Sequence, residues 1–148
     1  PSFIAGCVCN PNAKNTEVEV RRLTKKSLAG AVYSLSQPVF DISLGAKFFN
    51  LAGSIGSKLY CGLMPIKNKK ALQHIKEVPG INRGQEYRER LETQPESQIP
   101  DFSISYALEL ANSLKASVAG FHVISGGYPS LANELVQELH LKLVSSKA

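Results

Sequence analysis

The chain has 148 residues, enough for one domain with a sizeable core, and its 43% hydrophobic and 20% charged residues are those of an ordinary globular protein. The net charge of +5 comes from scattered basic residues without stacking aromatics beside them, so we expect an anionic ligand and no nucleic acid. No apolar run is long enough to span a membrane and no secretory leader is recognisable, so we also expect no membrane partner.

Strands and helices are predicted to alternate along the chain. The predicted strands cover residues 3–9, 31–36, 58–63 and 117–124, and they are continuous apolar runs. Predicted helices cover 16–29, 42–52, 68–77, 83–91 and 129–144, together with a long amphipathic helix capped by Asp101. Thr16 and Glu19 form a capping-box pattern, Asp41 is a further helix cap, and 93–100 is a polar loop.

Continuous apolar strands indicate a parallel sheet covered by helices. Two α/β architectures fit about four βα units of this kind. One is a small doubly wound sheet, and the other is the second half of a (β/α)8 TIM barrel, with an extra helix before the last strand. The chain opens at Pro1 and the buried-strand pattern starts at once, over residues 3–8, so we expect that upstream sequence is missing. This abrupt start favours the half barrel for residues 1–148.

In both architectures ligands bind at the C-terminal ends of the strands, which are Asn10, Gln37, Pro65 and Ser125. An amide such as that of Gln37 can read the donor and acceptor edge of a heterocycle such as a pterin. The alternative is that Gln37 only hydrogen bonds to the backbone of its loop. A loop is expected at this position because Pro38 cannot donate a backbone hydrogen bond to a neighbouring strand.

The first predicted helix carries a second candidate site. Glu19, Arg22 and Lys26 fall on one helix face, and Leu23 is expected to point nearly the opposite way. One acid among bases suits a nucleotide, because the carboxylate accepts from ribose hydroxyls while the cations bind phosphates. The alternative is a solvated face with helical ion pairs.

Cysteines and histidines give no site. Three cysteines are an odd and sparse count, which indicates a reducing cytoplasm and buried thiols rather than disulfides. Cys7 and Cys9 would share one face of a strand, but the further ligands that zinc needs do not stand at a suitable spacing. Packing or surface roles are expected for the histidines, which are His74, His122 and His140.

Several motifs together resemble the methylenetetrahydrofolate reductase family. The most specific is the run of residues 36–41, Ser-Gln-Pro-Val-Phe-Asp. Others are 9–12 (Cys-Asn-Pro-Asn), 62–66 (Gly-Leu-Met-Pro-Ile), 77–81 (Glu-Val-Pro-Gly-Ile), and the basic helix that ends in Ala29, Gly30 and Ala31. Their order resembles strands five to eight of that barrel, most closely in the reductase modules fused behind a homocysteine methyltransferase domain in some bacteria.

The resemblance implies an FAD-bound barrel that passes a hydride from NADH or NADPH, through the flavin, to 5,10-methylenetetrahydrofolate, giving 5-methyltetrahydrofolate. It implies that Gln37 binds the folate pterin and that Asn10 lies on the flavin side. It also assigns the adenosine diphosphate portion of FAD to four residues of the first helix, namely Glu19, Arg22, Lys25 and Lys26.

The chain departs from the family pattern in ways that bear on activity. The family's general acid and its flavin-side aspartate come from barrel strands that would lie upstream of Pro1, so we assign no catalytic residue. Ile75 stands where the family has an aromatic against the folate benzoyl ring, and Ala71 stands where it has a glutamine. The loop at Gly126, Gly127 and Tyr128 replaces larger or basic residues.

Three hypotheses follow. The chain is part of a flavin reductase that needs the missing N-terminal half of the barrel, or it is a non-catalytic half barrel that binds or dimerises through its open strand edges. The third is a small doubly wound monomer with an unrelated ligand. The first predicts FAD binding when the barrel is complete, and the second predicts a homo-oligomer without flavin.

Overall fold

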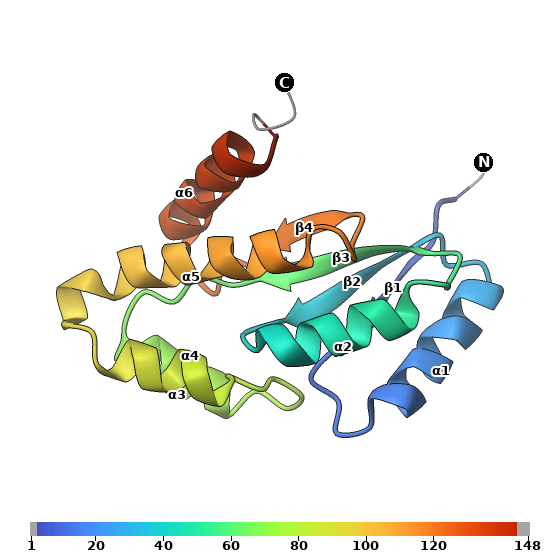
Figure 1. Cartoon of the computed structure of the whole chain (residues 1–148), viewed down its shortest axis with the longest axis horizontal. Helices are drawn as coiled ribbons and strands as arrows, with labels where there is room; N and C mark the ends of the chain where they lie inside the picture. Colours follow the sequence, from blue (N-terminus) through green and yellow to red (C-terminus); the bar gives the residue numbers. More distant parts are fainter. Residues whose placement is uncertain (1–2, 145–148) are drawn as a thin grey trace.

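The computed structural model describes residues 3–144, so residues 1–2 and 145–148 of the predicted domain lie outside the described part. Four strands form a single parallel sheet in the order β1-β2-β3-β4. These strands are β1 (Gly6–Cys9), β2 (Tyr33–Pro38), β3 (Lys58–Leu63) and β4 (Gly120–Val123). The outer strands of the sheet are therefore β1 and β4 (Figure 1).

The helices are α1 (Thr16–Leu28), α2 (Ile42–Ala52), α3 (Lys69–Lys76), α4 (Gln85–Glu92), α5 (Ile99–Leu114) and α6 (Pro129–Leu139), with a π-helical turn at His140–Val144. Each strand is followed by at least one helix, as predicted, and α4 is the expected extra helix. No helix within residues 3–144 is both long and apolar enough to cross a membrane.

The strand order decides between the two predicted architectures. Parallel strands in sequential order, joined by right-handed crossovers, place their covering helices on the same face of the sheet. Figure 1 shows α1, α2 and α5 side by side along this face, with α6 extending beyond β4. A doubly wound sheet reverses its strand order and carries helices on both faces, so the half barrel is confirmed and the doubly wound alternative is wrong.

The core lies between the sheet and these helices. Phe48 and Phe49 of α2 and Leu114 of α5 are fully buried there, in one hydrophobic cluster with Cys61 and Cys9 from the sheet. Burial raises the pKa of both thiols to about 12, so they remain protonated at neutral pH and are weak nucleophiles and metal ligands. Packing is thus the role of these two cysteines.

The N-terminal segment departs from the prediction of a buried strand over residues 3–9. The strand begins only at Gly6, and Phe3, Ile4 and Val8 are 90%, 80% and 61% exposed. A continuous apolar run predicts burial because it is typical of a strand inside a sheet with both faces covered. In this structure β1 pairs only with β2, and its other side and one of its faces are uncovered.

Several element boundaries also differ from the sequence prediction. Helix α1 is capped by Asn15, whose Oδ1 accepts from Val18 N at 3.0 Å, instead of by a capping box at Thr16. Helix α5 begins at Ile99, so Asp101 lies within its first turn and does not cap it. Part of the predicted loop 93–100 is a 3-10 turn, Glu96–Gln98. The Asp41 cap is confirmed by its hydrogen bond from Leu44 N at 3.0 Å.

A buried hydrogen-bond cluster fixes the extra helix to the strand ends. Ser103 of α5 accepts from Ile66 N, which follows β3, at 2.6 Å, and its Oγ lies 3.0 Å from the hydroxyl of Tyr87 in α4. Tyr106 OH donates to Phe40 O at 2.9 Å, after β2. The connections after β2 and β3 are thereby held against α4 and α5.

Candidate functional site

Because the strands are parallel, the four predicted strand ends lie together at the C-terminal end of the sheet, as expected. Asn10 follows β1, Pro65 and Ser125 follow β3 and β4, and Gln37 lies within the last two residues of β2. The register of β2 shifts between Leu35 and Pro38, next to β3. This irregularity shapes the position of Gln37.

Ser36 holds the backbone around Gln37. Its Oγ donates to Gln37 O at 2.8 Å and accepts from Gly62 N at 2.8 Å. The absence of a side chain at Gly62 allows this close approach, because a Cβ there would lie 2.7 Å from Ser36 O. Asn12 Nδ2 holds the next carbonyl, that of Pro38, at 3.0 Å. The loop backbone is thus held by Ser36 and Asn12, and the side chain of Gln37 is exposed at the strand ends.

The cluster of Glu19, Arg22 and Lys26 on α1 is only partly exposed to solvent, so the alternative of a solvated helix face with ion pairs holds only in part. Glu19 is buried, its Oε1 accepts from Asn10 N at 3.1 Å, and its Oε2 lies 3.5 Å from Arg22 Nη1. Leu23 is fully buried beside Glu19, so the expectation that these two side chains point in opposite directions is wrong. A separation of four residues places them on the same face of a helix.

The three predicted cofactor-binding cations, among the four basic residues of α1, have different surroundings. The side chain of Arg22 is 68% exposed, and Lys25 is exposed as well. Lys26 instead donates from Nζ to the carbonyl of Val8, in the edge strand β1, at 2.7 Å. Asn10 is also partly engaged, because its Oδ1 accepts from Asn12 N at 3.0 Å. Arg22, although paired with Glu19, and Lys25 are therefore the exposed cations among these three.

Two cavities at the strand ends were not found by sequence reasoning. The first has a volume of about 190 Å³ and is mostly apolar. It lies between Met64 after β3, Ala71 and Ile75 of α3, and Tyr128 after β4. Ala71 and Ile75 are the positions where the sequence departs from the family pattern, and both line this cavity.

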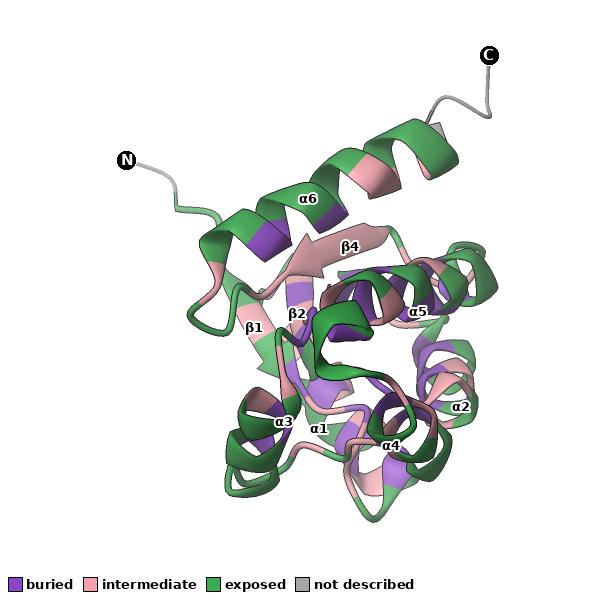
Figure 2. Cartoon of the chain, turned by 90° about the vertical axis from the view of Figure 1, so that its left-hand side faces the viewer, coloured by how far each residue is buried: buried purple, intermediate pink, exposed green. Residues whose placement is uncertain are grey.

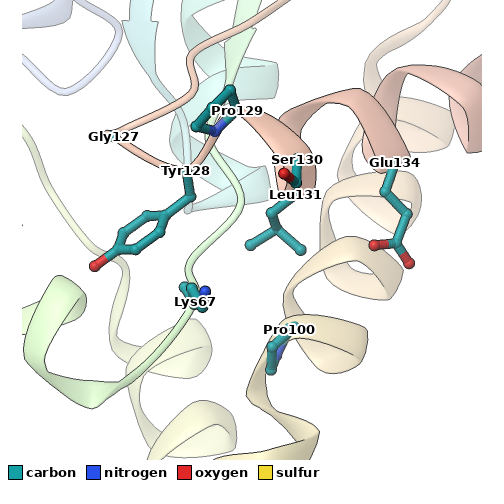
Figure 3. A pocket seen from close by; sticks show the side chains of 8 residues that line it. All are labelled: Lys67, Pro100, Gly127, Tyr128, Pro129, Ser130, Leu131 and Glu134. Carbon is teal, nitrogen blue, oxygen red and sulfur yellow. The ribbon is translucent and has the colours of Figure 1, made fainter.

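The second cavity, of about 390 Å³, adjoins the beginning of α6 (Figure 3). Its lining includes Lys67, Pro129 and Glu134, together with Tyr128, which also lines the first cavity. Lys67 Nζ lies 5.4 Å from the centre of the Tyr128 ring. The turn over residues 126–129 borders both cavities and was recognisable in the sequence. The cavities themselves could not be predicted, because the other lining residues come from α3 and α5, far away in sequence.

The histidines are placed as expected for packing or surface roles. His122 is half-buried in β4, and its Nε2 lies 2.9 Å from Ser36 O. His140 is exposed, and His74 lies at the rim of the apolar cavity. Within residues 3–144, no group of three or more His, Cys, Asp or Glu side chains is arranged to hold a metal ion.

Comparison with known proteins adds the family. The family model described as methylenetetrahydrofolate reductase matches residues 5–140. A similar solved structure is described as an uncharacterized protein from Clostridium thermocellum that binds two copies of 5-methyl-5,6,7,8-tetrahydrofolic acid. Its TM-score is 0.67 at 18% sequence identity, and the match covers 94% of this chain and 54% of that chain, so it shows a shared fold.

This chain therefore spans about half the length of that solved structure. The sequence matches no curated protein. The family match covers most of the chain and agrees with the half-barrel topology and with the motifs at the strand ends. The chain belongs to the methylenetetrahydrofolate reductase family.

Proposed function

We propose that this chain supplies part of the FAD and folate site of a methylenetetrahydrofolate reductase. In that reaction NADH or NADPH is the reductant, and 5,10-methylenetetrahydrofolate becomes 5-methyltetrahydrofolate. The observation that carries the proposal is that Glu19 of α1 accepts from Asn10 N, just after β1, at the same end of the sheet as the exposed Gln37 amide. The particular likeness to bifunctional methyltransferase–reductase modules stays a prediction.

The residues of α1 fit the adenosine diphosphate portion of FAD in part. Arg22 and Lys25 are exposed cations one turn apart, which suits a diphosphate. Glu19 is positioned by Asn10 N and is the acid expected to accept from a ribose hydroxyl. Lys26 Nζ already donates to the Val8 carbonyl at 2.7 Å, which uses one of its three N–H donors. When bound, FAD would supply the hydride transfer, and these residues would hold its nucleotide end.

The folate side rests on Gln37 and the apolar cavity. An amide offers two donors and one acceptor, which can match the edge of the pterin ring. The 190 Å³ cavity, lined by Met64, Ile75 and Tyr128, is suited to the benzoyl ring of the same substrate. The neighbouring cavity carries Lys67, a cation that can pair with the carboxylates of the glutamate tail.

Reduction of the methylene group also needs a proton donor close to the pterin nitrogen. The four strand ends carry Asn10, Gln37, Pro65 and Ser125, none of which is a carboxylic acid. We infer that the general acid comes from the other half of the barrel. The chain by itself is then expected to bind ligands without turning over substrate.

Flavin titration tests the cofactor part. We expect saturable quenching of FAD fluorescence by the chain, with competition by ADP and none by riboflavin, since only the nucleotide end is held. Arg22→Ala with Lys25→Ala should weaken binding at least about tenfold, whereas Lys58→Ala, an exposed cation at the opposite end of β3, should leave it unchanged. The absence of FAD binding, both in this chain and in a chain extended upstream, would refute the assignment.

Equilibrium dialysis with 5-methyltetrahydrofolate tests the substrate part. Gln37→Ala should weaken folate binding about tenfold or more, while Gln73→Ala, an exposed glutamine of α3, should have no effect. Equal binding by the two variants would exclude Gln37 as the pterin contact.

A further inference from the structure

The hydrogen-bond ladder between β2 and β3 changes its partner at Ser36. In a parallel ladder every second residue of a strand bonds to the same neighbour, and Val32 O, just before β2, accepts from Lys58 N at 3.0 Å. In the same register Ser36 O would accept from Gly62 N. Gly62 N instead donates to the side-chain Oγ of Ser36, at 2.8 Å. The hydroxyl of Ser36 thus takes the ladder bond that its own carbonyl would have received.

The carbonyl that is left over contacts His122 of β4. Its oxygen lies 2.9 Å from His122 Nε2, although β3 separates β4 from β2. His122 is paired in register with Gly62, so its ring reaches Ser36 across a residue that has no side chain. A Cβ on Gly62 would lie only 3.0 Å from His122 Nε2. Because a carbonyl oxygen can only accept, Nε2 is the ring nitrogen that carries the donated hydrogen.

Both peptide groups that flank the Cα of Gln37 are held by these side chains. Ser36 O is held by His122, and Gln37 O accepts from Ser36 Oγ at 2.8 Å. A peptide group is planar, so the orientation of the two groups around a Cα sets the direction of its side chain. The direction of the exposed Gln37 amide therefore depends on His122 and Ser36.

The contact between the ring and the carbonyl is sheltered from solvent. Ser36 is 3% exposed, and Figure 2 shows β4 half-buried along its whole length. Without His122 the Ser36 carbonyl would lose its partner where water has little access, and an unsatisfied buried group is unfavourable. The peptide is then expected to turn back towards Gly62 N, its partner in a regular ladder, and this turn redirects Gln37.

We propose that His122 is a positioning residue for folate recognition. It holds Ser36 O out of the ladder with β3 and thereby aims the Gln37 amide at the pterin ring, and the identity of this ligand rests on the proposed function. An amide that makes two hydrogen bonds at once tolerates little misdirection, because each bond needs a heavy-atom distance of about 2.9 Å and a nearly straight angle. His122 therefore acts on the ligand through the backbone of β2.

Equilibrium dialysis with 5-methyltetrahydrofolate tests the positioning role. His122→Ala should raise the dissociation constant at least about tenfold, because the amide is no longer aimed. His122→Gln should keep it within about threefold, since the Nε2 of glutamine also donates from nearly the distance of the imidazole Nε2. His140→Ala, at an exposed histidine, should have no effect, and circular dichroism verifies that each variant is folded.

The Gln37→Ala background distinguishes positioning from a general loss of structure. The amide is absent there, so His122→Ala should cause no further loss of folate affinity. Binding of ADP, which the proposed function assigns to α1, should be the same in the wild type and in His122→Ala. An unchanged folate affinity in His122→Ala, an equal loss in both backgrounds, or a parallel loss of ADP affinity would overturn the proposal.

Nitrogen-15 NMR tests the contact without any ligand. The neutral ring of His122 should carry its hydrogen on Nε2, and the side-chain amide signals of Gln37 should shift in His122→Ala and return in His122→Gln. A neutral ring with its hydrogen on Nδ1, or Gln37 signals that respond to neither change, would also exclude this role. If the signals behave as expected while the wild type binds no folate, the proposed function fails and the role of His122 in placing Gln37 stands.

Discussion

Replacing Ser103 with Ala should be the most damaging small substitution near the site. The side chain is 2% exposed, and its hydroxyl serves two buried partners, Ile66 N at 2.6 Å and Tyr87 OH at 3.0 Å. Alanine leaves both without this partner, and an unsatisfied buried polar group costs about 1–3 kcal/mol. Since the Tyr87 hydroxyl can turn, we expect a loss of roughly 2–4 kcal/mol in the free energy of unfolding.

Urea unfolding followed by circular dichroism measures this loss. With a urea dependence of about 1–3 kcal/mol/M, the midpoint should fall by roughly 1–2 M. Ser105→Ala, an exposed serine two residues away on α5, should change stability by no more than about 0.5 kcal/mol. Because Ile66 also borders the apolar cavity, the Ser103→Ala variant should lose folate affinity as well.

A double-mutant cycle separates the two partners. In the Tyr87→Phe background the hydroxyl of Tyr87 is already absent, so Ser103→Ala should cost about 1 kcal/mol less than in the wild type. Equal costs in both backgrounds would show that the tyrosine does not depend on Ser103. A loss as small as that of Ser105→Ala would refute the reasoning from buried hydrogen bonds altogether.

The other predictions concern the sheet, the buried thiols and the first helix cap. Gly62→Ala places a Cβ 2.7 Å from Ser36 O, so chemical unfolding should show a loss of about 1–3 kcal/mol, whereas Gly56→Ala, whose Cβ meets nothing closer than 3.8 Å, should be nearly neutral. Burial raises the pKa of Cys9 and Cys61 from 9.0 to about 12, so the folded state holds these protons more tightly and stability falls as pH rises from 9 towards 12. The slope is about 1.4 kcal/mol per pH unit for each thiol, and replacing both cysteines by alanine should flatten it; an unchanged slope would contradict the assignment. Asn15→Ala removes the acceptor for Val18 N and should cost about 1 kcal/mol in thermal or urea unfolding, and no loss would show that α1 does not depend on this cap.

The sequence alone determined the succession of elements and the end of the sheet where ligands gather. Apolar runs and helix caps depend on neighbours within a few residues, so β3 and α2 were predicted with the bounds they have. The run of residues 36–41 also placed Gln37 correctly at the end of its strand. The family assignment rested on such local motifs and was confirmed by the match over residues 5–140.

Contacts between distant segments were decided only by the tertiary structure. The serine that binds Ile66 and Tyr87 comes from α5, and the cavities at the strand ends need side chains of α3, α5 and α6. Helical spacing correctly grouped Glu19 with Lys26, but it could not show that both turn towards the edge of β1. The physical reason is that the residue pattern of a strand indicates only which of its faces are apolar. The groups that hydrogen bond to the edge of a strand depend on which segments fold beside it.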